Sequence, residues 1–88
     1  MKIQRRGQAG TMQSSDLMVI VEPADALSIE IESTVKQQFE HLIRARIEAV
    51  LAKHGAKHLR VSVNDRGALD YAIEARLAAA LQRAGGQP

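Results

Sequence analysis

The segment Leu59-Arg60-Val61-Ser62-Val63 alternates strictly between apolar and polar side chains, and a helical pattern follows it. Alternation is typical of a strand with one face on a core and the other in water. From residue 69 the apolar residues recur every three or four positions, which indicates an amphipathic helix that begins near residues 64–67 and ends at Gly85-Gly86. Its apolar stripe consists of Leu69, Ile73, Leu77, Ala80 and Leu81. A strand followed directly by a helix favours an α/β structure.

Two further strands are predicted upstream of this unit. The run Leu17-Met18-Val19-Ile20-Val21 is continuously apolar, as in a strand covered on both faces, and Leu27-Ser28-Ile29-Glu30-Ile31-Glu32 alternates. Pro23 cannot donate a ladder hydrogen bond and Asp25 suits a turn. We therefore expect these two strands to form a β-hairpin with the five-residue loop 22–26.

A long helix is predicted between the second and third strands. Thr34 and Gln37 have the spacing at which hydroxyl and amide side chains cap a helix start, and Gly55 offers the left-handed conformation that ends many helices. The apolar stripe of this helix consists of Val35, Phe39, Leu42, Ile43, Ile47, Val50 and Leu51. A helix at this place supplies the crossover that parallel neighbouring strands require.

The predicted fold is therefore an α/β (α+β) two-layer sandwich with the order β-β-α-β-α. It has a three-stranded mixed sheet with both helices on one face. We expect residues 1–16 to be a flexible leader, residues 17–84 to be one small domain, and residues 85–88 to be a disordered tail. A chain of 88 residues is too short for a large internal active site.

The composition also predicts a compartment. The chain has no cysteine, which excludes disulfides, thiolate zinc sites and a cysteine nucleophile and fits a reducing cytoplasm. Its longest apolar runs, such as residues 17–21, are far shorter than the roughly 20 residues that a membrane span needs. Residues 1–10 lack the apolar stretch of a secretory signal. We expect a cytoplasmic protein without a membrane partner.

The small positive net charge belongs to the first ten residues. Lys2, Arg5 and Arg6 lie there without an acid, whereas the remaining residues hold nine basic and ten acidic side chains. Phe39 and Tyr71 are the only Phe, Tyr or Trp residues, so the chain has few aromatic side chains on which nucleic-acid bases could stack. We therefore expect no nucleic-acid partner, although a small nucleic-acid-binding α/β domain that uses the three basic residues stays open as an alternative.

Histidines and acids give no strong candidate for catalysis or metal binding. His54 and His58 are four residues apart, but Gly55 interrupts the helix that would bring them to one face. His41 lies beside the apolar stripe and suits a boundary position rather than a catalytic base. Glu30 and Glu32 suit a solvated strand face, whereas Asp65 suits a helix cap and Asp70 the first turn of a helix. The sequence therefore predicts no catalytic residue and no metal ligand, and any catalytic side chain is expected from a partner.

A short polar stretch stands just before the first apolar strand and contains Ser14-Ser15-Asp16. An exposed serine is a place at which a transferase can attach a phosphate-linked group. The same residue types are common in turns at strand entries, where their side chains bond nearby backbone N–H groups. The pattern alone favours the turn and leaves the attachment site open.

Three blocks of the sequence resemble the acyl carrier subunit, or gamma chain, of citrate lyase across nearly the whole chain. The blocks are Ala9-Gly10-Thr11 with Ser14-Ser15-Asp16, then Val35-Lys36-Gln37-Gln38-Phe39 with Ile43-Arg44, and finally Asp65-Arg66-Gly67-Ala68-Leu69-Asp70 with Ala75-Arg76-Leu77. In that family the first serine of the Ser-Ser-Asp block carries 2'-(5''-phosphoribosyl)-3'-dephospho-CoA through a phosphodiester. The resemblance implies that Ser14 is the attachment site, with Ser15 as the fallback.

The resemblance also implies a non-catalytic carrier of acetyl and citryl thioesters. An alpha subunit, the acyl transferase, would exchange acetyl for citryl, and a beta subunit, the citryl lyase, would release oxaloacetate and regenerate the acetyl carrier. Citrate would thereby be cleaved to acetate and oxaloacetate. A prosthetic-group transferase is a further implied partner. Arg5 and Arg6 are candidates for neutralising the phosphates of the arm.

Four residues depart from the pattern of that family. Met12 and Gln13 stand where we expect Leu and Glu, and Tyr71 and Glu74 stand where we expect Cys and Arg. Neither pair touches Ser14. The carrier of malonate decarboxylase is the close alternative, and a purely structural adaptor is a third; residues 67–70 favour citrate lyase.

Overall fold

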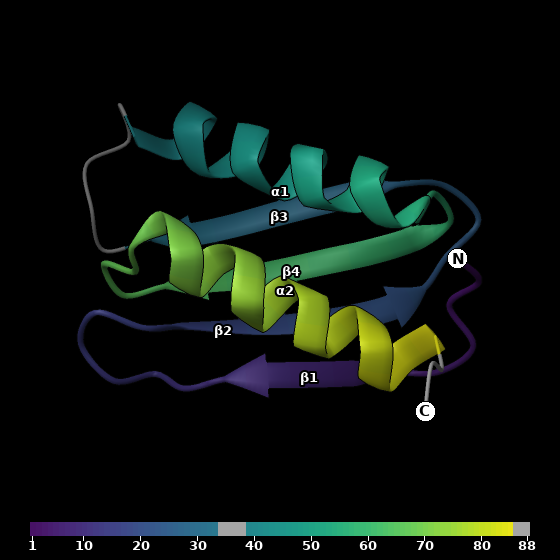
Figure 1. Ribbon diagram of the computed structural model, residues 1–88, viewed down its shortest axis with the longest axis horizontal. Helices are drawn as coiled ribbons and strands as arrows, with labels where there is room; N and C mark the ends of the chain where they lie inside the picture. Colours follow the sequence, from purple (N-terminus) through teal and green to yellow (C-terminus); the bar gives the residue numbers. More distant parts are fainter. Residues whose placement is uncertain (34–38, 86–88) are drawn as a thin grey trace.

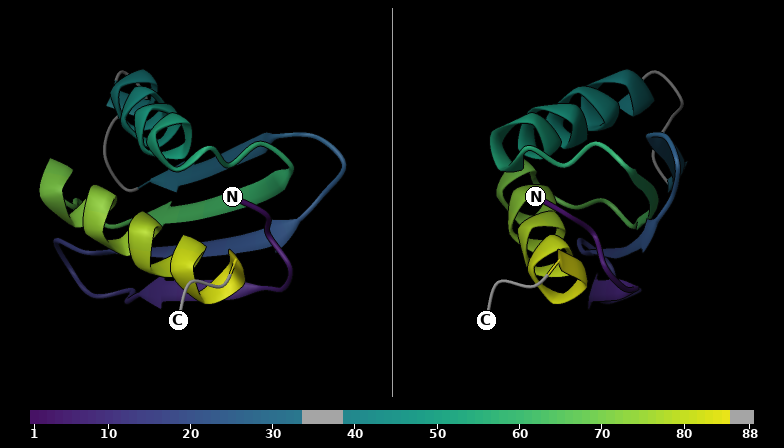
Figure 2. Two further views of the ribbon diagram at one scale, coloured as in Figure 1. Left: turned by 45° about the vertical axis from the view of Figure 1, so that its right-hand side comes forward. Right: turned by 90° about the vertical axis from the view of Figure 1, so that its right-hand side faces the viewer.

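The computed structural model describes residues 1–33 and 39–85, which form a four-stranded sheet with two helices on one face (Figures 1 and 2). The elements in chain order are β1 (Gly7–Gly10), β2 (Leu17–Pro23), β3 (Ser28–Ser33), α1 (Glu40–His54), β4 (Leu59–Asp65) and α2 (Asp70–Gly85). The strand order is β1-β2-β4-β3. β1 pairs with β2 and β2 with β4 in antiparallel fashion, whereas β3 and β4 are parallel. The predicted two-layer α/β class and the crossover helix are confirmed.

The prediction of three strands is wrong because it omits β1. Gly7 and Gly10 bound this strand and carry no side chain, so the sequence shows no alternation there. The missing side chain of Gly7 lets α2 approach β1 closely, because a Cβ at this position would meet the backbone nitrogen of Ala84 at 2.7 Å. α2 therefore packs directly on the backbone of β1, and Ala9 is the inward side chain.

The prediction of a β-hairpin between the first two apolar strands is also wrong. β4 lies between β2 and β3 and pairs with both. The connection after Pro23 crosses the end of β4, where the backbone nitrogen of Ala24 donates to the carbonyl oxygen of His58 at 3.3 Å. β2 carries apolar side chains on both faces, but only Leu17, Val19 and Val21 are buried.

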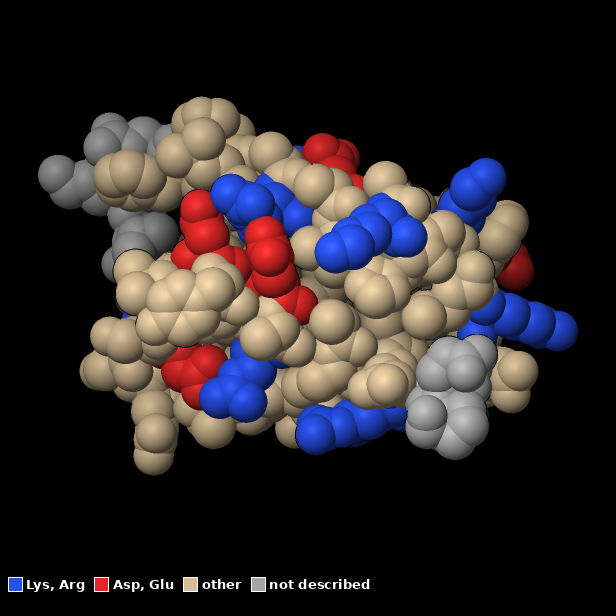
Figure 3. Space-filling model, in the orientation of Figure 1, with Lys and Arg blue, Asp and Glu red and all other residues tan. Residues whose placement is uncertain are grey.

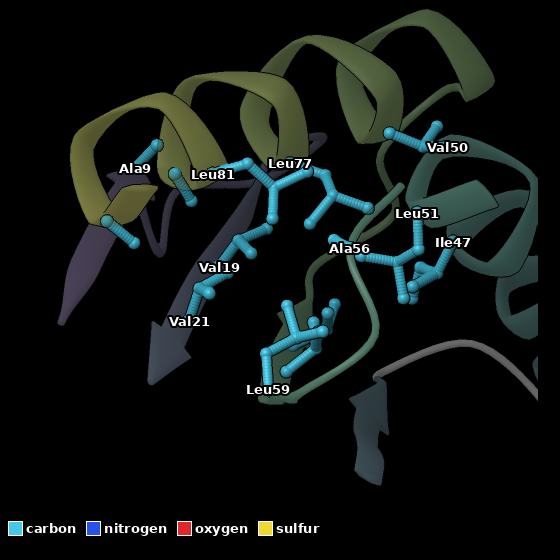
Figure 4. Close-up of a cluster of buried hydrophobic side chains, with 14 of the residues drawn as sticks. Ala9, Val19, Val21, Ile47, Val50, Leu51, Ala56, Leu59, Leu77 and Leu81 are labelled. Carbon is cyan, nitrogen blue, oxygen red and sulfur yellow. The ribbon is translucent and has the colours of Figure 1, made fainter. Parts of the chain in front are cut away.

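The two helices cover the sheet with most of the residues that their periodicity predicts, and Ile43, Ile47, Val50 and Leu51 of α1 and Ile73, Leu77, Ala80 and Leu81 of α2 are buried. The prediction is wrong for Phe39, Leu42 and Leu69, which lie at the helix starts and are exposed. The core formed between the layers is shown in Figure 4 and includes Val19, Val21, Ile47, Leu51, Leu59, Val61, Leu77 and Leu81. α1 ends at Gly55 in the left-handed conformation, as predicted. The predicted helix start at Thr34 and Gln37, and Val35 of the stripe, lie outside the described residues.

The first six residues lie against the end of the molecule where α2 finishes. Ile3 is buried there, and the backbone nitrogens of Gln4 and Arg5 donate to the carbonyl oxygen of Ala84 at 3.0 and 3.1 Å. β1 then runs to the other end, where it meets the turn that leads into β2 (Figure 1). The flexibility expected for residues 1–16 and the disorder expected for residues 85–88 stay predictions.

Candidate functional site

Ser14 lies in the turn between β1 and β2, which we call the serine turn and define as residues 11–16. The backbone nitrogen of Thr11 donates to the carbonyl oxygen of Leu17 at 3.1 Å, and that of Asp16 donates to the carbonyl oxygen of Gln13 at 3.2 Å. Ser15 has a φ of 65°, in the left-handed region that non-glycine residues rarely adopt. The turn reverses the chain between two strands and presents its middle residues at one end of the sheet.

The carboxylate of Asp16 holds the serine turn together. Its Oδ2 accepts a hydrogen bond from the hydroxyl of Thr11 at 2.6 Å, and its Oδ1 accepts one from the backbone nitrogen of Leu17 at 2.8 Å. Arg76 on α2 donates to both oxygens, with Nε 3.1 Å from Oδ1 and Nη2 2.8 Å from Oδ2. This two-point pairing ties the turn to the helix.

The same contacts keep Asp16 ionised. Hydrogen bonds from Arg76, then from Thr11 and the backbone of Leu17, hold the pKa of Asp16 well below its usual value. The Asp16 side chain is 14% exposed, whereas that of Arg76 is 41% exposed. In turn, the carboxylate raises the pKa of Arg76. The pair stays charged at neutral pH.

A second attachment joins the serine turn to the loop between β4 and α2. The backbone nitrogen of Ser15 donates to the carbonyl oxygen of Arg66 at 2.8 Å, and the backbone nitrogen of Arg66 donates to the carbonyl oxygen of Asp16 at 2.9 Å. The main chain is therefore held at the two residues that follow Ser14.

The loop that carries Arg66 is itself fixed by a buried acid. Asp65 is 2% exposed and accepts hydrogen bonds from the backbone nitrogen of Ala68 and the hydroxyl of Ser33, both at 2.9 Å. Asp65 therefore caps the turn that precedes α2, and α2 itself begins at Asp70. This bond network gives the serine turn a firm base.

Ser14 and Ser15 are both exposed at the tip of the turn. Within residues 1–33 and 39–85 the hydroxyl of Ser14 accepts and donates no hydrogen bond, in contrast to that of Thr11. A group attached to this oxygen would displace no internal contact. The Ser14 hydroxyl therefore fits a covalent phosphodiester: it is accessible, it is not committed to the fold, and the backbone of the two residues after it is held in place.

The candidate residues Glu30, His54 and His58 lie away from the serine turn. Glu30 pairs with Arg60 at 2.7 Å, while His58 Nδ1 lies 3.0 Å from the carbonyl oxygen of Asp25. His54 lies in the last turn of α1. Among the described residues no cluster of three His, Cys, Asp or Glu could hold a metal ion.

The basic residues of the first ten positions do not lie beside Ser14. Arg5 and Arg6 precede β1 and lie at the end where α2 finishes, whereas the serine turn follows β1 at the opposite end (Figure 1). On the face shown in Figure 3, acidic and basic side chains lie next to one another over the two helices. The arginines that the structure brings to the turn are Arg66 and Arg76, which residue spacing alone does not single out.

Large apolar side chains are exposed around the starts of the helices. They are Phe39, Leu42, Leu69 and Tyr71, and Tyr71 is 72% exposed. Glu74, one of the residues that differ from the family pattern, forms an ion pair with Arg46 at 2.8 Å. The start of α2 and the serine turn lie at the same end of the molecule (Figure 2).

In the parts of the chain that are described, neither helix is long and apolar enough to cross a membrane.

This chain is similar in sequence to known acyl carrier proteins and similar in fold to a solved structure. Residues 4–84 match a family model described as the malonate decarboxylase delta subunit. The chain is 46% identical to a citrate lyase acyl carrier protein of Lacticaseibacillus casei, with 96% of this chain and 84% of that protein covered. It is 49% identical to one of Haemophilus influenzae, with coverages of 96% and 88%.

A solved structure shares the fold. A chain in the crystal structure of a Pseudomonas malonate decarboxylase hetero-tetramer in complex with malonate superposes with a TM-score of 0.68 at 22% identity. The similarity covers 97% of this chain and 93% of that chain.

Proposed function

Because this chain belongs to the citrate lyase acyl carrier protein family, we propose that it carries acyl groups on a prosthetic group attached to Ser14. The observation that carries the proposal is the exposed Ser14 hydroxyl, which has no hydrogen-bond partner among the described residues. It stands next to a backbone held by Arg66 and by the Asp16–Arg76 pair. A carrier needs such an attachment point more than it needs a catalytic group of its own.

The proposed group is 2'-(5''-phosphoribosyl)-3'-dephospho-CoA, joined to the Ser14 oxygen as a phosphodiester. When bound, this group supplies a terminal thiol on which an acyl group is held as a thioester. The chain contributes the attachment oxygen and a firm turn, and the Asp16–Arg76 pair keeps that turn on α2. Ser15, whose backbone bonds Arg66, is the fallback attachment site.

We assign the catalytic steps to partner subunits. An alpha subunit would transfer the acyl group, a beta subunit would cleave the citryl group to oxaloacetate, and a prosthetic-group transferase would load Ser14. The exposed apolar side chains near the start of α2, Leu69 and Tyr71, offer these partners a contact surface at the same end as Ser14. This assignment makes the chain a non-catalytic subunit that works in the cytoplasm.

Malonate decarboxylase offers a second candidate function. The family model that matches residues 4–84 is described as its delta subunit, and a chain of that complex shares the fold. The two functions differ in substrate. Acyl exchange of the loaded carrier with partner subunits, measured with citrate and with malonate in parallel, separates them: turnover with citrate supports the first, and turnover with malonate alone supports the second.

The attachment site is tested by intact-mass measurement of the chain produced together with its biosynthetic enzymes. We expect one added prosthetic group on the wild type and on Ser15→Ala, and none on Ser14→Ala. Because both serines are exposed, neither substitution is expected to disturb the fold. Loss of the increment in Ser15→Ala alone would move the site to Ser15, and an unmodified wild type would overturn the carrier proposal.

A further inference from the structure

Arg66 is attached through its main chain to the residues that follow Ser14. Its carbonyl oxygen accepts from the nitrogen of Ser15, and its nitrogen donates to the carbonyl oxygen of Asp16. Both bonds are shorter than 3.0 Å. The backbone from which the Arg66 side chain projects is therefore held beside the attachment point, although the two residues lie 52 positions apart in the chain.

The guanidinium of Arg66 is uncommitted in the described part of the chain. Arg66 is exposed and has neither an ion pair nor a side-chain hydrogen bond there. The other arginines after β1 have partners: Arg46, Arg60 and Arg76 pair with acids, and Arg44 and Arg83 donate to carbonyl oxygens of Ile29 and Gln8.

Two acids adjoin Arg66, Asp65 in the chain and Asp16 through a backbone hydrogen bond, and both are already occupied. Asp16 accepts from Arg76, Thr11 and the backbone of Leu17, and Asp65 is buried with its two oxygens bonded to Ala68 and Ser33. Arg66 is thus a cation without an acidic partner, held next to a serine. A phosphodiester on that serine would place a permanent negative charge at this position.

We propose that Arg66 binds the phosphodiester formed on Ser14 and thereby sets the direction in which the attached group leaves the serine turn; this rests on the proposed function. The planar guanidinium matches the geometry of phosphate oxygens and can donate two parallel hydrogen bonds. Arg76 is less suited to this role because its charge is already paired with Asp16, which its Nε and Nη2 bond. Arg5 and Arg6 lie at the opposite end of β1.

The neighbourhood of Arg66 leaves room for a bound group. A Cβ placed on the next residue, Gly67, would find no heavy atom within 4 Å. The space next to the backbone beside Arg66 is therefore open.

The test compares the unmodified and the loaded wild-type chain by NMR. We expect the side-chain Nε–H resonance of Arg66 to shift on loading and to exchange with water at least about threefold more slowly, because a phosphate oxygen accepts its hydrogen bond. Arg5 is the matched control, since it is an exposed arginine at the far end of β1. An Arg66 resonance that changes no more than that of Arg5 would overturn the proposal.

Substitution gives a second, independent readout. In loaded Arg66→Gln we expect the phosphorus-31 line of the phosphodiester to narrow by about a third or more as the group gains local motion, whereas Arg66→Lys keeps part of the broadening and Arg5→Gln keeps all of it. An equal linewidth in Arg66→Gln and Arg5→Gln refutes the role of Arg66. Intact mass is recorded on every sample, and a wild-type chain that takes up no group counts against the proposed function instead. Should Arg66→Gln load poorly, the wild-type comparison decides.

Discussion

Replacing the carboxylate of Asp16 by an amide removes the link between the serine turn and α2. In Asp16→Asn the residue keeps its size and an acceptor oxygen for Thr11, but it loses the charge that Arg76 bonds at two points. A hydrogen bond to a charged group contributes about 1.5–3 kcal/mol, and the exposure of Arg76 places the expected loss toward the low end. We expect the free energy of unfolding to fall by about 1–2 kcal/mol at pH 7.

The stability that Asp16 contributes depends on pH because its pKa differs between the folded and the unfolded chain. The pKa of Asp16 is lower in the folded chain than in the unfolded chain, so the unfolded state takes up the proton first as the pH falls. The stabilisation is complete above about pH 4 and decreases progressively below it, toward the folded pKa. The difference between wild type and Asp16→Asn should therefore be largest at neutral pH and shrink in acid.

Thermal unfolding followed by circular dichroism from pH 7 to pH 2.5 measures both quantities. For a chain of this size the expected loss lowers Tm by roughly 5–12 °C at pH 7. Asp25→Asn is the matched control, because Asp25 is exposed in the loop after β2 and should change Tm little. An Asp16→Asn variant that is no less stable than Asp25→Asn, or whose loss of stability is as large at pH 2.5 as at pH 7, would refute the stabilising role of the Asp16–Arg76 pair.

Three further predictions concern the core, the sheet edge and the partner surface. Leu77→Ala, at a fully buried position, should lower the free energy of unfolding in urea by about 2–5 kcal/mol, whereas Leu69→Ala, 59% exposed, should lower it by well under 1 kcal/mol; similar losses would contradict the described core. Gly7→Ala should cost about 1–3 kcal/mol because the methyl group overlaps the backbone of α2, and Gln8→Ala on the same strand serves as the control. Tyr71→Ala should leave Tm unchanged within about 3 °C but weaken assembly with the partner subunits in analytical ultracentrifugation, and unchanged assembly would remove Tyr71 from the contact surface.

The features that the sequence predicts well are those with a local pattern. The alternation at residues 59–63, the period of α2 and the glycine after α1 each depend on neighbouring residues, and each is present in the structure. β1 was not predicted because its side chains are too few to show a pattern, and the strand order was not predicted because β4 inserts between two segments that follow one another in the chain.

In the candidate site, too, the predictable part depends on neighbouring residues and the rest on distant ones. Ser14 follows from a block of adjacent residues, whereas its supports come from distant ones: Arg76 is 60 positions from Asp16, and the bonds of Arg66 are made by its main chain, which carries no sequence signal. Arg5 and Arg6 were candidates because they are near Ser14 in sequence. The length of β1 separates them from it in space.

The double attachment of the serine turn has a consequence for how a tethered thioester would find its targets. An arm on a freely moving leader would sample a large sphere around the body and spend little time at any one active site. An arm on Ser14, in a turn held at two places, would instead sample mainly the space beyond one end of the molecule, since the protein itself occupies the other side. This smaller volume would raise the local concentration of the acyl group for each partner active site that faces that end. Transferase and lyase sites would both have to open toward the same pole of this chain.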